Sequence, residues 1–225
     1  MTAPNFCMLL RKHIGNGKIV SVSQPGLERI IRFEIEHLDE LGDLCRKYLI
    51  VELMGKHSNI IFCTPDDKII DSIKHISAQI SSVREVLPGR DYFIPQAAGK
   101  KDPLSSDEAV FKETLSASQA PSGKAIYTSF TGLSPVMAEE FCHLASIDAD
   151  VPAASLSDLE LTHLSRTLVL AMEQVRDGLF SPNILYKEEE PVEFSALPLT
   201  SWPPEYKAVT YESISSTLEL YYSSK

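Results

Sequence analysis

The sequence of 225 residues has no long apolar run and no N-terminal leader pattern. No stretch reaches the roughly 18 to 20 consecutive apolar residues that a membrane-spanning helix requires. The first residues also lack the basic segment followed by an apolar segment that marks a secretory signal peptide. We therefore expect a cytoplasmic protein without a membrane partner.

Cysteine is scarce and scattered. The four cysteines form no Cys-x-x-Cys pair, and the six histidines show no His-x-x-x-His spacing. This pattern indicates neither a zinc site nor a disulfide framework. Buried, reduced thiols are the simpler interpretation, because free cysteine behaves as a small apolar residue. We expect no metal site.

Signatures of catalysis are also missing. The sequence contains no phosphate-binding loop, no Gly-x-Gly-x-x-Gly and no Gly-x-Ser-x-Gly. A hydrolytic triad could still be assembled from distant residues, but no pattern points to one. We expect a protein that is not an enzyme, with no catalytic residue and no cofactor.

Basic residues are fewer than acidic ones. The sequence has 21 Lys and Arg against 31 Asp and Glu, which gives a formal net charge of -10. Nucleic-acid affinity comes largely from Lys and Arg that neutralise phosphates. The chain alone should therefore bind nucleic acid too weakly to detect at physiological salt. The basic residues are not spread evenly along the chain, however. Many of them lie within the first 90 residues, which is compatible with a local basic face, and they include Arg11, Lys12, His13, Lys18, Lys68, Lys74, His75, Arg84 and Arg90.

Hydrophobic residues make up 44% of the sequence, which is enough for one large core or two small ones. Apolar residues at helical spacing predict a helix that ends at Gly15-Asn16-Gly17. Alternation and then short apolar runs predict strands, and turn residues separate them. The expected strands form an antiparallel meander: Lys18 to Gln24, Arg29 to His37, Tyr48 to Met54, Asn59 to Cys63, and Lys68 to Ile73.

The pattern changes after Arg84. Leu87 to Tyr92 is rich in turn residues, and Ile94 to Pro103 is typical of a linker. Helical periodicity follows, and the chain closes with strand-like sequence and a last helix. We predict an α+β protein with a sheet domain over 1–103, a helical module over 104–180, and return strands with a closing helix over 181–225. The expected helices are Asp107 to Ser116, Gly123 to Phe130, one opening at Ser134-Pro135, Leu156 to Arg176, and Ile214 to Tyr222.

Two segments carry polar residues where the pattern does not require them. Glu52 ends an apolar strand, and the simpler interpretation is that it faces solvent or pairs with a nearby lysine. The segment from Gly55 to Asn59 is predicted to form a turn. For His57 or Asn59, we prefer a hydrogen bond that stabilises this turn to a direct contact with RNA. Glu28 and Arg29 follow Gly26-Leu27. They are either a solvated surface pair or a binding site. In such a site, Arg29 would donate two parallel hydrogen bonds to a phosphate, and Glu28 would accept one from a base or ribose hydroxyl.

The chain resembles a known family along nearly all of its length. The segments PNFCMLLRKHIGNGKI, QPGLERII, VELMGKHSNIIF, IIDSIKHIS and SVREVLPGRDY are similar to the NFACT-N region of the bacterial RqcH proteins. That family has been described as fibronectin-binding protein A-like and is related to the eukaryotic NEMF proteins. FTGLSPVMAEE is similar to its helix-hairpin-helix module, and SISSTLELYYSSK to the segment that precedes its coiled coil.

The resemblance implies a role in ribosome-associated quality control. The full-length proteins bind the large ribosomal subunit that carries a stalled peptidyl-tRNA, and they recruit alanyl-tRNA so that the nascent chain receives a C-terminal alanine tail. An acidic residue followed by Arg engages tRNA in that family, and Glu28 and Arg29 stand in its place. Further candidates for contact with RNA or the ribosome are Lys12, His13, Lys56, His57, Lys74, His75 and Arg84.

The chain departs from the family pattern in two ways. Glu28 replaces the commoner Asp, so Arg29 is the safer of the two assignments. The NFACT-N region of the family starts well before Pro4, which implies a partial sheet domain, similar to the N-terminal domain of formamidopyrimidine-DNA glycosylases but without their catalytic proline. A sheet that lacks strands exposes an unpaired edge, so we expect self-association through that edge.

Two other function classes compete with this reading. A fibronectin-binding surface adhesin is the alternative that the older family name suggests, and the missing leader and anchor count against it. A nucleic-acid repair enzyme would rest on fold analogy alone.

Overall fold

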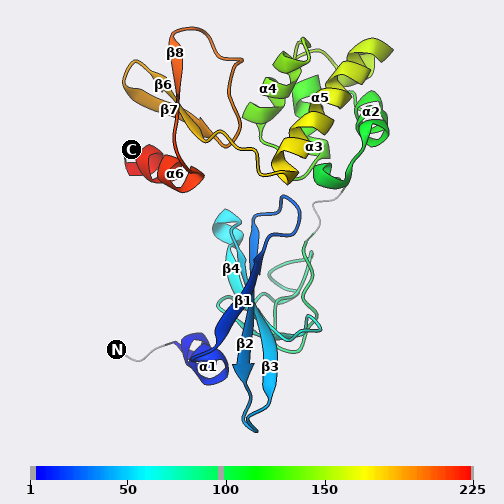
Figure 1. Ribbon diagram of the computed structural model, residues 1–225. Coiled ribbons are helices and arrows are strands. Elements are labelled where there is room, and N and C mark those ends of the chain that lie inside the picture. Colours follow the sequence, from blue (N-terminus) through cyan, green and yellow to red (C-terminus); the bar gives the residue numbers. More distant parts are fainter. Residues whose placement is uncertain (1–3, 96–98, 224–225) are drawn as a thin grey trace. The chain divides into compact units, whose positions relative to one another are not determined.

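The computed structural model describes residues 4–95 and 99–223, and the chain divides into two compact units with the boundary between residues 98 and 99. The first unit is built on an antiparallel sheet, and the second contains helices followed by a smaller sheet (Figure 1). The predicted α+β class is therefore confirmed. Lys101 already bridges to Phe130, so the second unit starts slightly before the expected boundary at residue 103.

The first unit contains a five-stranded antiparallel meander in the order β1-β2-β3-β4-β5, as the alternation predicted. Strand β1 lies at one edge, and every one of its residues is exposed. The unit consists of α1 (Asn5–Ile14), β1 (Lys18–Ser23), β2 (Ile30–Leu38), β3 (Leu44–Glu52), the short 3-10 helix η1 (Gly55–His57), β4 (Asn59–Cys63) and β5 (Ile69–Ser72).

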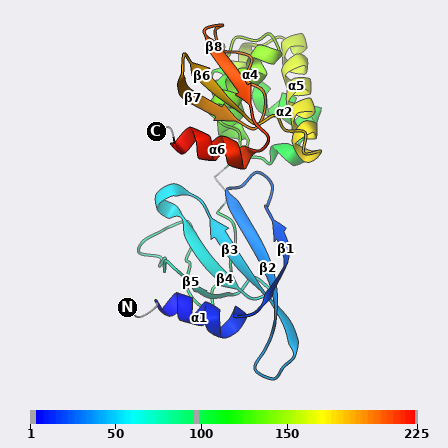
Figure 2. The same cartoon turned by 60° about the vertical axis from the view of Figure 1, so that its left-hand side comes forward.

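Alternation along β4 sends side chains to both faces of the sheet. Ile61 and Cys63 are fully buried in a core on one face, against which Tyr92 and Ile94 pack. Phe62 points to the other face, where its ring lies 5.9 Å from that of His13. Helix α1 lies beside the sheet in both ribbon views (Figures 1 and 2). The sheet is therefore covered by α1 on one face and by the irregular segment 73–95 on the other.

The second unit begins with helices, one of which starts at the predicted Ser134-Pro135. Ser134 accepts from the amide of Met137 ahead of Pro135, and Ser157 forms a capping box with Glu160. The part of the chain that the structure describes contains no helix long and apolar enough to span a membrane. The helices are η2 (Pro103–Ser105), α2 (Glu108–Ser116), α3 (Ser122–Ser129), α4 (Pro135–Leu144), η3 (Ala153–Ser155) and α5 (Asp158–Arg176).

Helices α3 and α4 are joined by a short loop, and their assignment as a helix-hairpin-helix module stays a prediction. The chain then forms a three-stranded antiparallel sheet in the order β7-β6-β8, with α6 packed next to it (Figure 2). These elements are β6 (Asn183–Lys187), β7 (Glu190–Ser195), β8 (Tyr206–Thr210) and α6 (Ile214–Ser223).

A buried carboxylate ties helix α4 to the segment that precedes β8. Glu140 is fully buried and accepts hydrogen bonds from the amides of Thr200 and Ser201, and from the Thr200 hydroxyl at 2.5 Å. Burial opposes ionisation of Glu140, but these donors outweigh it and hold the pKa of the carboxyl below its ordinary value of 4.5. The ionised Glu140 therefore fastens residues 200–201 to the helices.

Candidate nucleic-acid interface

A cavity of about 430 Å³ lies in the first unit, at the end of the sheet where β3 stops and β4 begins. Its lining combines cations with apolar side chains such as Met54, Ile76 and Val83. Five residues that the sequence singled out come together here from separate segments: Arg29, Lys56, His57, Lys74 and Arg84.

Arg29 reaches this cavity because of a tight turn before β2. The amide of Glu28 donates to the Pro25 carbonyl at 3.1 Å, and Gly26 has φ 54°, in the left-handed region that favours glycine. The Arg29 carbonyl then accepts from the amide of Leu53 at 2.8 Å, which fixes Arg29 beside the end of β3. The Arg29 side chain is exposed and lines the cavity, whereas Glu28 is half-buried at the turn.

Lys56 and His57 are presented by η1, which is held in place at its start. Gly55 has φ 56°, and the amide of Met54 donates to Ser58 Oγ at 2.9 Å. Lys56 and His57 are both exposed. The predicted turn is therefore observed, and the side chains of Lys56 and His57 line the cavity.

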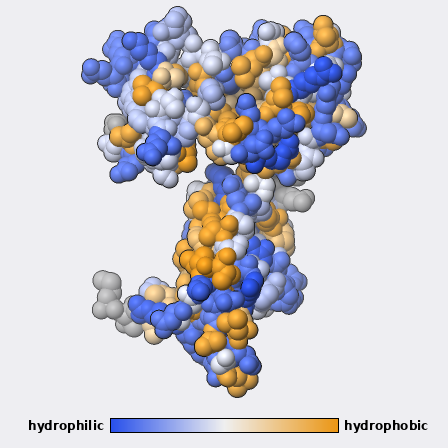
Figure 3. Space-filling model, in the orientation of Figure 1, coloured by the Kyte–Doolittle hydropathy of each residue, from blue (hydrophilic) through white to orange (hydrophobic). Residues whose placement is uncertain are grey.

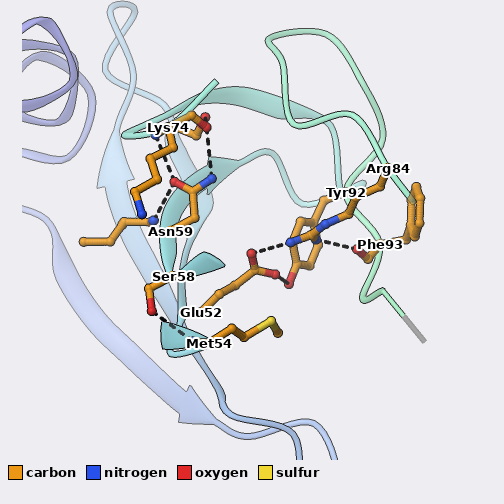
Figure 4. A network of polar contacts seen from close by, with 10 residues as sticks. Glu52, Met54, Ser58, Asn59, Lys74, Arg84, Tyr92 and Phe93 are labelled. Carbon is orange, nitrogen blue, oxygen red and sulfur yellow. Dashed lines mark hydrogen bonds and ion pairs between the residues drawn. The ribbon is translucent and has the colours of Figure 1, made fainter. Parts of the chain in front are cut away.

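Asn59 connects this turn to the segment that follows β5. Its Nδ2 donates to the Lys74 carbonyl at 3.0 Å, and its Oδ1 accepts from the Lys74 amide at 3.0 Å (Figure 4). The Lys74 ammonium in turn donates to the Lys56 carbonyl at 3.2 Å. These contacts lie outside the turn at 55–59, which is instead closed by Ser58 Oγ, so the turn-stabilising bond that we preferred for His57 or Asn59 is not the one that Asn59 makes.

Glu52 lies beneath the cavity, and our expectation for it was wrong. Its side chain is fully buried, and it forms an ion pair with Arg84 and accepts from the Tyr92 hydroxyl at 3.0 Å (Figure 4). Burial, followed by the nearby Glu52 charge, raises the pKa of Tyr92 well above its ordinary value. A buried carboxylate needs such partners, because an unpaired charge in the interior is very costly.

The pairing with Glu52 changes the place of Arg84 among the candidates. Its side chain is only 11% exposed, and it also donates to the Phe93 carbonyl at 2.7 Å. Arg84 thus belongs to the cavity wall, and Glu52 offsets its charge. Three other Lys and Arg residues line the cavity and form no ion pair with any residue that the structure describes: Arg29, Lys56 and Lys74.

The remaining candidates lie elsewhere in the first unit. Lys12 pairs with Glu40 at 3.2 Å beside a second hollow, which His13 also lines. Burial lowers the pKa of His13, and the neighbouring positive charge of Lys12 adds to this effect. His75 contacts Asp71 at 2.6 Å next to a third hollow. The structure does not bring these three residues to the cavity.

The two units differ sharply in charge. Residues 1–98 contain twelve Lys and Arg and twelve Asp and Glu, whereas residues 99–225 contain nine and nineteen. The whole net charge of -10 therefore belongs to the second unit. Within residues 4–95 and 99–223, no three His, Cys, Asp or Glu side chains are grouped so that they could hold a metal ion.

Hydrophobic side chains are visible on the surface of the first unit, over the part of the face that β1 crosses (Figure 3). Ile19 and Val22 of this strand are 58% and 59% exposed. Near the cavity, Ile80 and Val83 are exposed as well. Sequence reasoning missed Tyr92 and these apolar neighbours as part of the site, since only the turn residues around Asn59 gave a local signal.

The comparisons with known proteins cover the whole chain. The sequence family described as NFACT N-terminal and middle domains matches residues 1–225. The chain is 37% identical over 223 residues to the Rqc2 homolog RqcH of Bacillus subtilis, and 33% identical over 225 residues to that of Streptococcus suis. Both alignments include 99% of this chain, but they include only 37% and 36% of the two relatives, which are longer.

Solved structures show the same similarity. The N-terminal part of a fibronectin/fibrinogen-binding protein from Streptococcus suis superposes with a TM-score of 0.72 at 30% identity, over 100% of this chain and 74% of that one. A fibrinogen-binding protein from Staphylococcus aureus gives a TM-score of 0.74 at 27% identity, over 99% of this chain and 76% of that one.

Proposed function

Because the chain belongs to the family of NFACT N-terminal and middle domains, we propose that it is the part of a ribosome-associated quality-control factor that binds tRNA and the large ribosomal subunit. It acts by binding rather than by catalysis. The relatives named as Rqc2 homologs support the quality-control role. In the longer protein, this binding directs C-terminal alanine tailing of stalled nascent chains from alanyl-tRNA, in the cytoplasm.

One observation carries the proposal for tRNA. Arg29, Lys56 and Lys74 come from segments far apart in the sequence and converge on one cavity, in the unit that has no net negative charge. Cations that converge in this way attract the phosphates of RNA, whereas the acidic second unit repels them.

The lining suggests how RNA is held. A guanidinium donates two parallel hydrogen bonds to a phosphate, which suits Arg29 at the exposed corner. Lys56 and Lys74 add point charges beside it, and the apolar side chains below them offer a surface on which an RNA base can pack. In this proposal Glu28, half-buried one residue before Arg29, accepts from a base or ribose hydroxyl.

The test is a binding and tailing assay with the full-length protein that carries Arg29→Ala. Association with tRNA and with large subunits is measured by co-sedimentation, and alanine tailing on stalled chains is followed in parallel. We expect loss of tRNA association and tailing. Arg46→Ala is the matched control, because Arg46 is an exposed cation of the same sheet that pairs with Glu34 at 2.6 Å. Survival of tailing in Arg29→Ala would show that the assignment is wrong.

A second candidate function, adhesion to host proteins, is favoured by one specific observation. The structural neighbours are described as fibronectin- and fibrinogen-binding proteins, which favours adhesion to these host proteins as the alternative. Surface plasmon resonance with immobilised fibronectin separates the two. The quality-control proposal expects no saturable binding to fibronectin, and binding that survives Arg29→Ala while tRNA binding is absent would favour the adhesin.

A further inference from the structure

Asn59 is a buried amide at the edge of the cavity, and its contacts have a consequence for Lys74. Only 6% of Asn59 is exposed, at the first position of β4. Strand β5 ends at Ser72, and the last ladder hydrogen bond beyond it runs from the amide of Ile73 to the Ile60 carbonyl at 3.0 Å. The main chain of Lys74 therefore lies just past the end of the β4–β5 ladder.

The Asn59 side chain takes the place of a further ladder residue. It offers a donor and an acceptor to the two main-chain groups of Lys74, each at 3.0 Å, as a neighbouring strand would. The Ser72 hydroxyl adds a second donor to the Lys74 carbonyl at 2.9 Å. The main chain of Lys74 is thus fixed to β4, although its side chain is exposed.

This fixed main chain limits where the Lys74 ammonium can reach. One of its three N–H groups donates to the Lys56 carbonyl, 3.2 Å away, and the other two are available to an anion. Lys56 itself belongs to η1, which directly precedes the strand that starts with Asn59. Asn59 therefore joins the two lysine-bearing segments at one side of the cavity. Within residues 4–95 and 99–223, no acidic side chain forms an ion pair with Lys74.

We infer that Asn59 is a positioning residue for RNA binding, which holds Lys74 at the cavity so that its ammonium contacts an RNA phosphate together with Arg29 and Lys56. This inference rests on the proposed function, because it specifies how one phosphate contact of that site is made. Asn59 itself does not touch the RNA. Its effect on affinity is transmitted through Lys74.

A double-mutant cycle on the 225-residue chain tests this. Fluorescence anisotropy of labelled tRNA at low salt gives the affinity of wild type, Asn59→Ala, Lys74→Met and the double variant, and a salt series gives the slope of log K against log salt. We expect each single change to weaken binding about three- to tenfold and to reduce the slope by roughly 0.9, the value for one lost phosphate contact. The double variant should then be no weaker than Lys74→Met alone.

Two further variants keep the result interpretable. Ser72→Ala removes one donor to the Lys74 carbonyl and should move affinity in the same direction by a smaller factor, even if Asn59→Ala unfolds the first unit. Asn183→Ala is the matched control, because Asn183 is a buried amide in the second unit that also donates to main-chain carbonyls, at 2.8 Å to Ser181 and 2.9 Å to Leu197. It should leave the salt slope unchanged.

The possible failures are distinct. Additive losses in the cycle, or an unchanged salt slope in both Asn59→Ala and Ser72→Ala, would overturn the positioning role while tRNA binding by wild type still supports the proposed function. Absence of tRNA binding by wild type at low salt would overturn the proposed function, and the positioning role with it.

Discussion

Glu52 and Arg84 form an ion pair inside the first unit, with the Glu52 side chain fully buried and the Arg84 side chain 11% exposed. The two residues are 32 positions apart, and the pair joins the end of β3 to the irregular segment 73–95. The Tyr92 hydroxyl and the Phe93 carbonyl complete the hydrogen bonding of the pair. This network fixes the wall of the cavity that Arg29, Lys56 and Lys74 surround.

Replacing Glu52 by Gln should destabilise the first unit strongly. The change leaves the buried Arg84 guanidinium without its counter-charge, which typically costs about 3 kcal/mol or more in free energy of unfolding. Amide hydrogen exchange of β4 and of the residues around Val86 measures the effect in the first unit itself. Glu40→Gln is the control, since Glu40 pairs with Lys12 in an exposed ion pair and its loss should change protection little. Unchanged protection in Glu52→Gln would mean that the pair does not hold the wall.

Glu140 should make the second unit sensitive to acid. Because the folded protein holds the pKa of this carboxyl below 4.5, its ionised form contributes stability above that pH, and the contribution is lost as pH falls through the lowered pKa. Trp202 is the only tryptophan and follows Ser201, so its fluorescence reports on this segment. Glu140→Gln should lower the free energy of unfolding by about 2 kcal/mol at neutral pH and flatten its pH dependence below 4.5.

The neighbouring Glu139 supplies the control for that experiment. It is exposed on the same helix, so Glu139→Gln removes the same charge without touching the donors at Thr200 and Ser201. Equal effects of the two substitutions would contradict a specific role of Glu140.

The four free cysteines should react with thiol reagents in two classes. Cys63 and Cys142 are fully buried, and burial raises the pKa of each thiol to about 12. Cys7 and Cys45 are half-buried. At pH 8 and under native conditions, iodoacetamide should therefore modify Cys7 and Cys45 first, and the other two only after unfolding. Mass spectrometry of tryptic peptides over a time course checks this, and early labelling of Cys142 would contradict the packing of α4.

The edge strand β1 predicts self-association. Among the described residues, β1 pairs with β2 on one side only, and it exposes Ile19, Val20 and Val22. Such an edge offers unpaired backbone groups to a second strand. Light scattering should show mass above that of the monomer as concentration rises. Val20→Pro, which removes one backbone donor from β1, should reduce this association. A monomer at all concentrations would count against it.

The sequence predicted the elements better than the contacts between them. Alternation around Ile35 and the apolar run around Val51 marked strands, and Ser134 marked a helix start, because these signals are local. Glu52 was misread because its partner Arg84 lies 32 residues away, in a segment whose turn-rich sequence has no periodicity. Asn59 and Lys74 are 15 residues apart, and only the ladder between β4 and β5 brings them together.

The central claim is that the cavity in the first unit binds RNA through Arg29 and Lys74. The most direct measurement is the tRNA affinity of the 225-residue chain at low salt, where phosphate contacts are strongest. The affinities of two double variants are compared. The first carries Arg29→Ala and Lys74→Met. The second, the control, carries Arg46→Ala and Lys68→Met, which remove the same total charge from two ion-paired surface sites. We predict at least a tenfold loss in the first variant and less than about twofold in the second. Equal losses, or no loss in the first, would contradict the claim.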